Sequence, residues 1–339
     1  MKKVLFTSLL ILLLSAAIPF QAQATFPGKN IVFWDLGQSD EQKDNTLIEA
    51  YDLATKNNYG QALKIIDQKI QTSPKLTTLH VMKGLILNEL RMYIPAVRAL
   101  NDAQMIEGRH PGIHYGFCEV YRNLGMTDLS LQACRVAEEV HRFSPEAHYE
   151  YAQTLIATGE MKLANKSLST AAELDPSNAQ YHYQRGMNFY YLNQYEAAEN
   201  AFLKALSIDT SDVDSAYQLA YIYAAQNKAT LANQQIVKVL QIQKEHPKIQ
   251  SAKLLLEYVK NNALDKLPLK IIPHDYHVGR SKSYYQSGDY GLALIEIETA
   301  VKLKPNDLQT KEILIGLTSF LLRINTTEKT IKEMISIAG

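Results

Sequence analysis

A repeat of 34 residues runs through the middle of the sequence without an insertion, and it limits the chain to few architectures. Windows of this length begin at Lys43, Thr77, Pro111, Pro145, Ala179 and Val213, and the sixth ends at His246. The eighth and twentieth places hold small residues, which are Ala50, Gly84, Cys118, Ala152, Gly186 and Ala220, then Ala62, Ala96, Ser130, Ala164, Ala198 and Ala232. Small side chains let two helices approach closely where they cross, so each window predicts an antiparallel helix pair. One pair cannot bury its apolar face alone, so stacked pairs make the core.

The composition agrees with a helical fold and excludes two classes of partner. The 339 residues include 15 glycines and 11 prolines, a share of about 8% against a usual share of roughly 12%, which disfavours a turn-rich β-sandwich or barrel. The 35 basic and 35 acidic residues balance, so the chain lacks the positive charge that nucleic acids and anionic lipids attract. We therefore expect neither nucleic acid nor a lipid surface as a partner.

Residues 1–24 have the pattern of a signal peptide. Two lysines precede the apolar run from Val4 to Phe20, and small residues suited to signal peptidase follow it. An uncleaved membrane anchor is the alternative, but it needs about 20 apolar residues, and this run has 17. The first cysteine of the chain is Cys118, so no lipid can be attached to a cysteine at the new N-terminus. We therefore predict a periplasmic or secreted protein, not a lipoprotein, without an integral membrane segment after cleavage.

The repeat resembles the tetratricopeptide repeats, a family of 34-residue helix pairs. The best match begins at Ala179, and its residues that fit the family pattern are Gly186, Phe189, Tyr195, Ala198, Phe202 and Ala205. The dipeptide Asp175-Pro176 closes the preceding window, as is frequent in the family. The resemblance implies an all-α, right-handed superhelical solenoid of about seven antiparallel helix pairs with a capping helix pair. It also implies a concave groove that binds a partner, and no catalysis.

The sequence outside the six windows predicts further segments. Residues 25–42 form an N-terminal arm with the single tryptophan, Trp34, and the arm either covers the first pair as a strap or docks a partner. The six contiguous repeats occupy residues 43–246. Residues 247–273 read as a lone helix and a linker, where the array changes direction. A seventh repeat, out of phase with the others, and the capping helices occupy residues 274–339.

Recurrent residues outside the crossings mark one face of the first helices, because the fifth, ninth and twelfth places share one side of a helix. The fifth place holds tyrosine in four consecutive windows, and this side chain combines a large contact area with a hydrogen-bonding hydroxyl. In the family that the chain resembles, this face lines the groove. The predicted partner-binding residues are Tyr115, Arg122, Tyr149, Tyr183, Met187, Tyr190, Tyr217 and Tyr221. Packing between adjacent helices is the alternative role for these tyrosines, and the sequence leaves the two roles open.

The remaining candidates give one cross-link and no catalytic or metal site. Cys118 and Cys134 stand at the eighth and twenty-fourth places of one window, on facing helices, so they form either a disulfide or two buried thiols. Histidine recurs at the fourth place, but equivalent helices lie too far apart for one metal ion to bind several imidazoles. These histidines are His80, His114, His148 and His182, with His277 in the displaced unit. The sequence holds no phosphate-binding loop, metalloprotease motif or nucleophile elbow, so we expect neither a cofactor nor an enzymatic activity.

These observations predict a non-enzymatic interaction scaffold or adaptor of the bacterial periplasm or cell envelope that binds a peptide or helix of a partner protein in the groove. One alternative is a regulator that docks on an envelope enzyme or on a secretion or pilus assembly machine. The alternative from a different class is an envelope enzyme whose site carries no recognisable motif. The sequence names no partner, pathway or oligomeric state.

Overall fold

The computed structural model of the chain describes Val32 and residues 45–242, 246, 248–267, 270 and 272–322. Within these ranges every regular element is a helix, which confirms the all-α prediction. None of the described helices has the length and apolar character that a membrane span requires. The predicted signal peptide and the second predicted capping helix lie outside the described residues.

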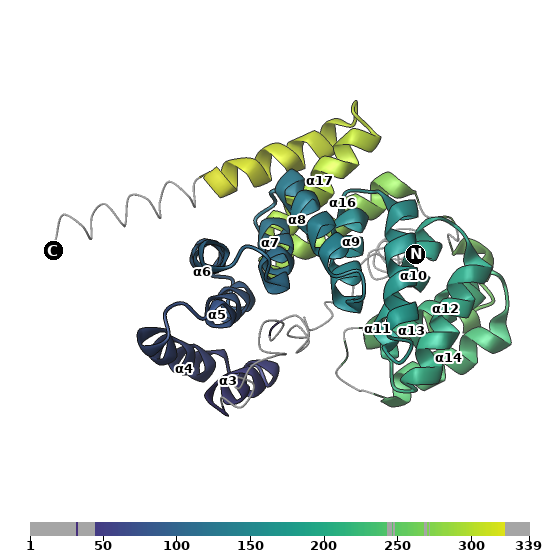
Figure 1. The fold of residues 1–339 in the computed structure, drawn as a ribbon. Helices are drawn as coiled ribbons and strands as arrows, with labels where there is room; N and C mark the ends of the chain where they lie inside the picture. Colours follow the sequence, from purple (N-terminus) through teal and green to yellow (C-terminus); the bar gives the residue numbers. More distant parts are fainter. Residues whose placement is uncertain are drawn as a thin grey trace.

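The helices form pairs that follow the 34-residue windows. The first helices are α3 (Asn45–Thr55), α5 (Thr77–Glu89), α7 (Pro111–Asn123), α9 (Pro145–Ala157), α11 (Ala179–Tyr191) and α13 (Val213–Ala225). The second helices are α4 (Tyr59–Thr72), α6 (Tyr93–Ile106), α8 (Thr127–Val140), α10 (Met161–Leu174), α12 (Tyr195–Ile208) and α14 (Ala229–Ile242). Each pair packs on the next, and in Figure 1 the pairs follow one another around an arc.

The two helices of a pair meet at the small residues that the repeat predicts. A Cβ atom added to Gly186 would lie 2.5 Å from the Phe202 ring, and one added to Gly84 would lie 2.7 Å from the Leu100 side chain. Ala198, also at a crossing, is fully buried. The small residue at the eighth place therefore makes room for the large residue at the twenty-fourth place, as close packing of a core requires.

Residues at the window boundaries start the first helices. Pro145 stands in the first turn of α9, where it loses no hydrogen bond, and the Ser144 side chain accepts a hydrogen bond from the Ala147 N–H. The Asp212 carboxylate accepts hydrogen bonds from the N–H groups of Asp214 and Ser215 at the start of α13. These caps explain why the helices begin where the windows begin.

The turn inside each pair needs one residue with a positive φ angle, and this residue stands at the fifteenth place of the window. Five windows place there Asn57, Gly125, Gly159, Asn193 and Asn227, residue types that tolerate the left-handed region. In the second window this residue is Arg91, with a φ angle of 59°. Arginine has no such tolerance, so its presence there calls for a compensating contact.

The array continues into elements that break the 34-residue phase. α15 (Lys248–Lys260) packs against α13 and α14, in the place of a further first helix. A short 3-10 helix, η3 (Leu264–Lys266), precedes the pair α16 (Pro273–Ser287) and α17 (Tyr290–Leu303), and a helix over residues 308–322 follows. α17 packs against α7 and α9, so the chain returns to the middle of the array.

One residue of the predicted N-terminal arm is described. Val32 is fully buried and belongs to the same hydrophobic cluster as Leu47 of α3 and Leu79 of α5. The strap and the docking arm both stay predictions. Trp34 lies outside the described residues.

A disulfide joins the facing helices of the third pair. Cys118 of α7 and Cys134 of α8 are bonded, with their Cα atoms 4.7 Å apart. The bond links residues separated by 16 positions, and closing a loop of this size stabilises a fold by about 3 kcal/mol in the chain-entropy account.

We expect the purified protein, denatured without reductant, to contain no free thiol. The chain has 2 cysteines, and the disulfide uses both of them. Titration with a chromogenic thiol reagent measures this, and the same sample after reduction is the control. Two free thiols per chain before reduction would support the buried-thiol alternative.

Candidate functional site

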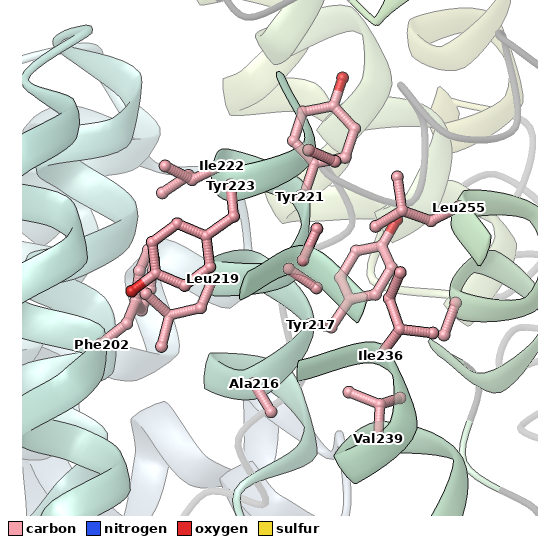
Figure 2. Close-up of a cluster of buried hydrophobic side chains, with 14 of the residues drawn as sticks. Phe202, Ala216, Tyr217, Leu219, Tyr221, Ile222, Tyr223, Ile236, Val239 and Leu255 are labelled. Atoms are coloured by element: carbon pink, nitrogen blue, oxygen red, sulfur yellow. The ribbon is translucent and has the colours of Figure 1, made fainter. Parts of the chain in front are cut away.

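The candidate site is the face of the first helices that carries Tyr115, Tyr149, Tyr183 and Tyr217, and we name it the tyrosine face. Its part on α11 and α13 is buried. The exposed fraction is 1% for Tyr183, 5% for Met187, 2% for Tyr190 and 0% for both Tyr217 and Tyr221. Figure 2 shows the Tyr217 ring beside Ile236 and Leu255, within a hydrophobic cluster. These five side chains therefore form part of the core.

α15 packs against the cluster that holds these five residues. The Lys248 ammonium of α15 lies 5.1 Å from the centre of the Tyr217 ring, and Leu255 and Tyr258 of α15 belong to the same hydrophobic cluster. The five were predicted as partner-binding residues, with packing between helices as the alternative for the tyrosines. Their packing role is visible, and a role in partner binding stays a prediction.

On α7 and α9, the tyrosine face is polar. Tyr115 is buried and its hydroxyl donates a hydrogen bond to Glu119, 3.3 Å away. Arg122 is partly accessible and its Nη2 atom donates to the Glu150 carboxylate at 2.7 Å. Tyr149 is also partly accessible, and its ring packs against Tyr181 with centroids 5.2 Å apart. The predicted residues on α7 and α9 thus meet carboxylates as well as aromatic rings.

Four polar residues of this region were absent from the predicted set. They are Asn88, Glu89, Glu119 and Glu150. The Asn88 amide donates a weak hydrogen bond to Glu119 at 3.4 Å and accepts one from Asn123 at 2.9 Å. Asn88 stands at the twelfth place of its window, like Arg122, and Glu89 stands at the thirteenth. A comparison of the twelfth and thirteenth places in all windows would have identified Asn88 and Glu89 as candidates.

Burial changes the proton affinity of the carboxyl groups in this region. Burial and, next, the Glu150 carboxylate raise the pKa of Glu89 to about 7, although a hydrogen bond with Tyr59 and the charge of Arg122 oppose the shift. Burial, followed by the charges of Glu150 and Glu89, holds the pKa of Glu119 well above its usual value. Glu89 and Glu119 therefore hold a proton to a higher pH than an exposed glutamate does, which limits the negative charge of the cluster.

The recurring histidines have a structural explanation. The Nε2 atom of His80 lies 2.9 Å from the Pro74 carbonyl oxygen, and His148 makes the same contact with the Arg142 carbonyl at 2.9 Å. In both cases the acceptor lies six residues earlier, in the loop before the helix. The fourth-place histidine thus ties the helix to that loop. Among the described residues, no group of three or more His, Cys, Asp or Glu side chains is arranged to hold a metal ion.

A different histidine, His141 at the end of α8, should make stability depend on pH. Burial and, next, the charges of His110 and His114 lower its pKa from 6.5 to about 4. Between these pH values the unfolded chain binds more protons than the folded chain at this residue. The contribution of His141 is therefore complete above pH 6.5 and is lost as the pH falls towards 4.

We expect His141→Gln to reduce the loss of melting temperature between pH 7 and pH 4 relative to the wild type. Melting curves at several pH values measure this. His148→Gln is a control with the opposite sign, because hydrogen bonds to Glu138 and to a carbonyl outweigh burial and raise the pKa of His148. A His141→Gln profile parallel to that of the wild type would contradict the assignment.

Three segments of the chain match family models for the tetratricopeptide repeat. Residues 179–212 match one model, and residues 145–178 and 274–307 match another. These segments contain the pairs α9–α10, α11–α12 and α16–α17. The resemblance predicted from the sequence is confirmed in these segments, including the displaced seventh unit.

Solved structures share the fold at low sequence identity. The APC/C hetero-tetramer Cut9-Hcn1 is 14% identical, over 85% of this chain and 51% of that chain, with a TM-score of 0.50. YrrB, a TPR protein with an unusual peptide-binding site, is 19% identical over 57% of this chain and 97% of that chain, with a TM-score of 0.46. The Pseudomonas aeruginosa protein pilF is 14% identical over 71% of this chain and 97% of that chain, with a TM-score of 0.47. No curated protein sequence matches the chain.

Proposed function

Because this chain carries tetratricopeptide repeats in an array of stacked helix pairs, we propose that it is a non-enzymatic scaffold or adaptor that binds a peptide or a helix of a partner protein. The observation that carries the proposal is the tyrosine face, whose places recur on successive first helices at a fixed interval of 34 residues. Packed helices lie about 8–10 Å apart, so such a face meets an elongated partner at regular steps.

The part of the tyrosine face on α7 and α9 is where we place the first contacts with the partner. Arg122 and Tyr149 remain partly accessible there, and Tyr115 lies beside them. A guanidinium, a phenol and the neighbouring carboxyl groups suit a partner segment that carries polar and aromatic side chains. The five buried residues on α11 and α13 join this surface only where the covering helices move away.

We propose the bacterial periplasm or cell envelope as the compartment. Residues 1–24 have the signal-peptide pattern. The disulfide between Cys118 and Cys134 agrees with an oxidising compartment, where such bonds persist. N-terminal sequencing of the exported protein should begin at Thr25, and a sequence that begins at Met1 would contradict export by cleavage.

Two other functions make different predictions for the same experiment. A regulator of an envelope enzyme, or of a secretion or pilus assembly machine, should be recovered with that enzyme or machine at a fixed ratio. An envelope enzyme with an unrecognised site should be active without any partner. The scaffold proposal expects a protein partner and no activity of the isolated chain.

The test is capture of the tagged mature chain from envelope extract after cross-linking in the cell. We expect at least one stoichiometric protein partner, and we expect Tyr149→Ala to reduce its recovery. Leu163→Ala is the matched control, because Leu163 lies on α10, the second helix of the same pair, and is 53% exposed. Recovery that falls equally in both variants, or no stoichiometric partner at all, would count against the proposal.

A further inference from the structure

α16 packs beside the tyrosine face of the fourth and fifth helix pairs. Near its start, the Tyr276 ring packs on the Tyr191 ring of α11, with centroids 4.7 Å apart. Tyr276 also belongs to the hydrophobic cluster of Leu155 and Ile156 on α9, against which Tyr149 packs. The start of α16 thus shares a cluster with Tyr149, which the sequence predicts as partner-binding.

The turn between α16 and α17 is hydrogen-bonded to the turn between α5 and α6. The Arg91 Nη1 atom donates a hydrogen bond to the Ser287 carbonyl at 2.9 Å, and its Nη2 atom lies 3.1 Å from the Asp289 carboxylate. Arg91 is the arginine with a positive φ angle, where the other windows have asparagine or glycine. These two contacts with the α16–α17 turn offset the backbone strain at Arg91.

α17 approaches α7 so closely that only glycine fits at the contact. A Cβ atom on Gly291 would collide with the Asn123 carbonyl group and would lie 2.6 Å from the Gly125 nitrogen. Farther along α17, the Thr299 hydroxyl donates a hydrogen bond to the Ala157 carbonyl at the end of α9, at 3.0 Å. The α16–α17 pair therefore has one defined position on the array.

The α16–α17 pair also has a polar core of its own. The Glu296 carboxylate of α17 is fully buried, and its two oxygens lie 2.7 Å from His277 Nδ1 and 2.7 Å from Arg280 Nε on α16. The pair matches a tetratricopeptide repeat model over residues 274–307. The contacts of Glu296 lie within the pair, whereas the Arg91–Asp289 ion pair and the hydrogen bond between His277 and Tyr191 join the pair to the array.

On the basis of the proposed scaffold function, we propose that the tyrosine face of α7, α9 and α11 is a helix-binding surface that α16–α17 occupies in cis. A partner helix reaches this surface by displacing the pair. Only chains in which the pair has left the face can bind the partner. The apparent affinity is therefore the intrinsic affinity multiplied by the fraction of such chains.

The occupant shows which partner the face accepts. α16 presents the Tyr276 ring near its start, where it packs on Tyr191 of α11. The same ring belongs to the hydrophobic cluster of Leu155 and Ile156 on α9, so it meets two successive first helices. The partner is therefore an amphipathic helix of a protein, with an aromatic side chain that takes the place of Tyr276.

The test compares full mature chains that differ in how firmly the pair is seated. Gly291→Ala adds the colliding Cβ atom at the second residue of α17. Gly60→Ala is the matched control, because Gly60 is the second residue of α4 and nothing lies within 4 Å of its Cβ position. The probe is a fluorescein-labelled synthetic peptide with the sequence of residues 272–306, and fluorescence anisotropy measures its binding.

We expect the peptide to bind the Gly291→Ala chain about tenfold more tightly than the wild-type chain, and the Gly60→Ala chain no more tightly than the wild type. Hydrogen exchange in α16 shows whether the pair has left the face. Faster exchange in α16 without tighter peptide binding would overturn the proposal, because the uncovered face would then not accept a helix. Unchanged exchange in the Arg91→Ala/Gly291→Ala double variant would also overturn it, because the pair would not be displaceable.

Arg91→Ala alone keeps the test valid if Gly291→Ala does not fold, because the Arg91 side chain is 49% exposed and its loss leaves the cores intact. We expect this variant to change peptide binding and exchange in the same direction as Gly291→Ala, to a smaller extent. Equal binding and exchange in Arg91→Ala and the wild type would count against the proposal. The peptide assay needs no external partner. A failed capture from envelope extract would therefore contradict the scaffold function, but not the docking of α16–α17 on the tyrosine face.

Discussion

Replacing Tyr217 with alanine is expected to lower the free energy of unfolding by about 3–5 kcal/mol. The Tyr217 side chain of α13 has no exposed surface and packs beside Ile236 of α14 and Leu255 of α15 (Figure 2). Loss of the ring leaves a cavity, because closely packed helices relax into such a space only in part. Urea unfolding followed by circular dichroism measures the change.

Tyr285→Ala is the control for this prediction, because 47% of Tyr285 is exposed. Its effect should be about 1 kcal/mol or less. A Tyr217→Ala chain with the unfolding midpoint of the wild type would contradict the core position of Tyr217. That result would return the residue to the candidate partner surface.

A similar loss is expected at Glu296, the buried carboxylate between α16 and α17. Glu296→Ala should lower the free energy of unfolding by about 3–5 kcal/mol, because it leaves a buried charge without its partner. Arg280 is the group that loses its counter-charge, and His277 loses its hydrogen-bond partner. The same urea unfolding experiment measures the effect.

A double variant separates the loss of charge from the loss of packing. Replacing a buried ion pair by apolar residues of similar volume is frequently neutral, so Glu296→Leu with Arg280→Met should be more stable than Glu296→Ala. A double variant as unstable as Glu296→Ala would show that the unpaired charge is not the cause. The loss would then come from the shape of this core.

The helix pairs could be predicted because their determinants are local and periodic. Gly186 and Phe202 meet within one window. A small residue at the eighth place and a large one at the twenty-fourth place predict the helix crossing from the sequence alone. Caps such as Ser144 before α9 act on the next few residues. Interactions over such short separations repeat with the window, so a single sequence shows them.

The burial of the tyrosines could not be predicted in the same way. Tyr183 and Tyr217 recur with the period of the array, and a packing residue and a binding residue at this place give the same pattern. What separates the two roles is the position of α15 and α16, which follow the six contiguous repeats and are out of phase with them. The sequence gives their helical character and not their position on the array.

The contacts of Arg91 and Gly291 show the same limit. Arg91 looks like an ordinary surface residue in its window, and its partners Ser287 and Asp289 belong to another repeat. Gly291 looks like a poor helix residue, and the reason for glycine is the Asn123 carbonyl of α7. A positive φ angle or a close backbone approach becomes visible only in three dimensions.

The hydrogen bond from Arg91 to Ser287 spans 196 residues, and it changes how the array should fold and unfold. In an open repeat array each pair contacts only its neighbours, so the ends fray first and stability is a sum of local terms. Here the seventh unit contacts the second to fifth pairs and closes a ring. Opening any of these pairs therefore breaks its contacts with the seventh unit as well as those with its neighbours. Loop closure over this distance also slows folding. The first half of the array cannot complete its contacts until the chain has been synthesised past Asp289.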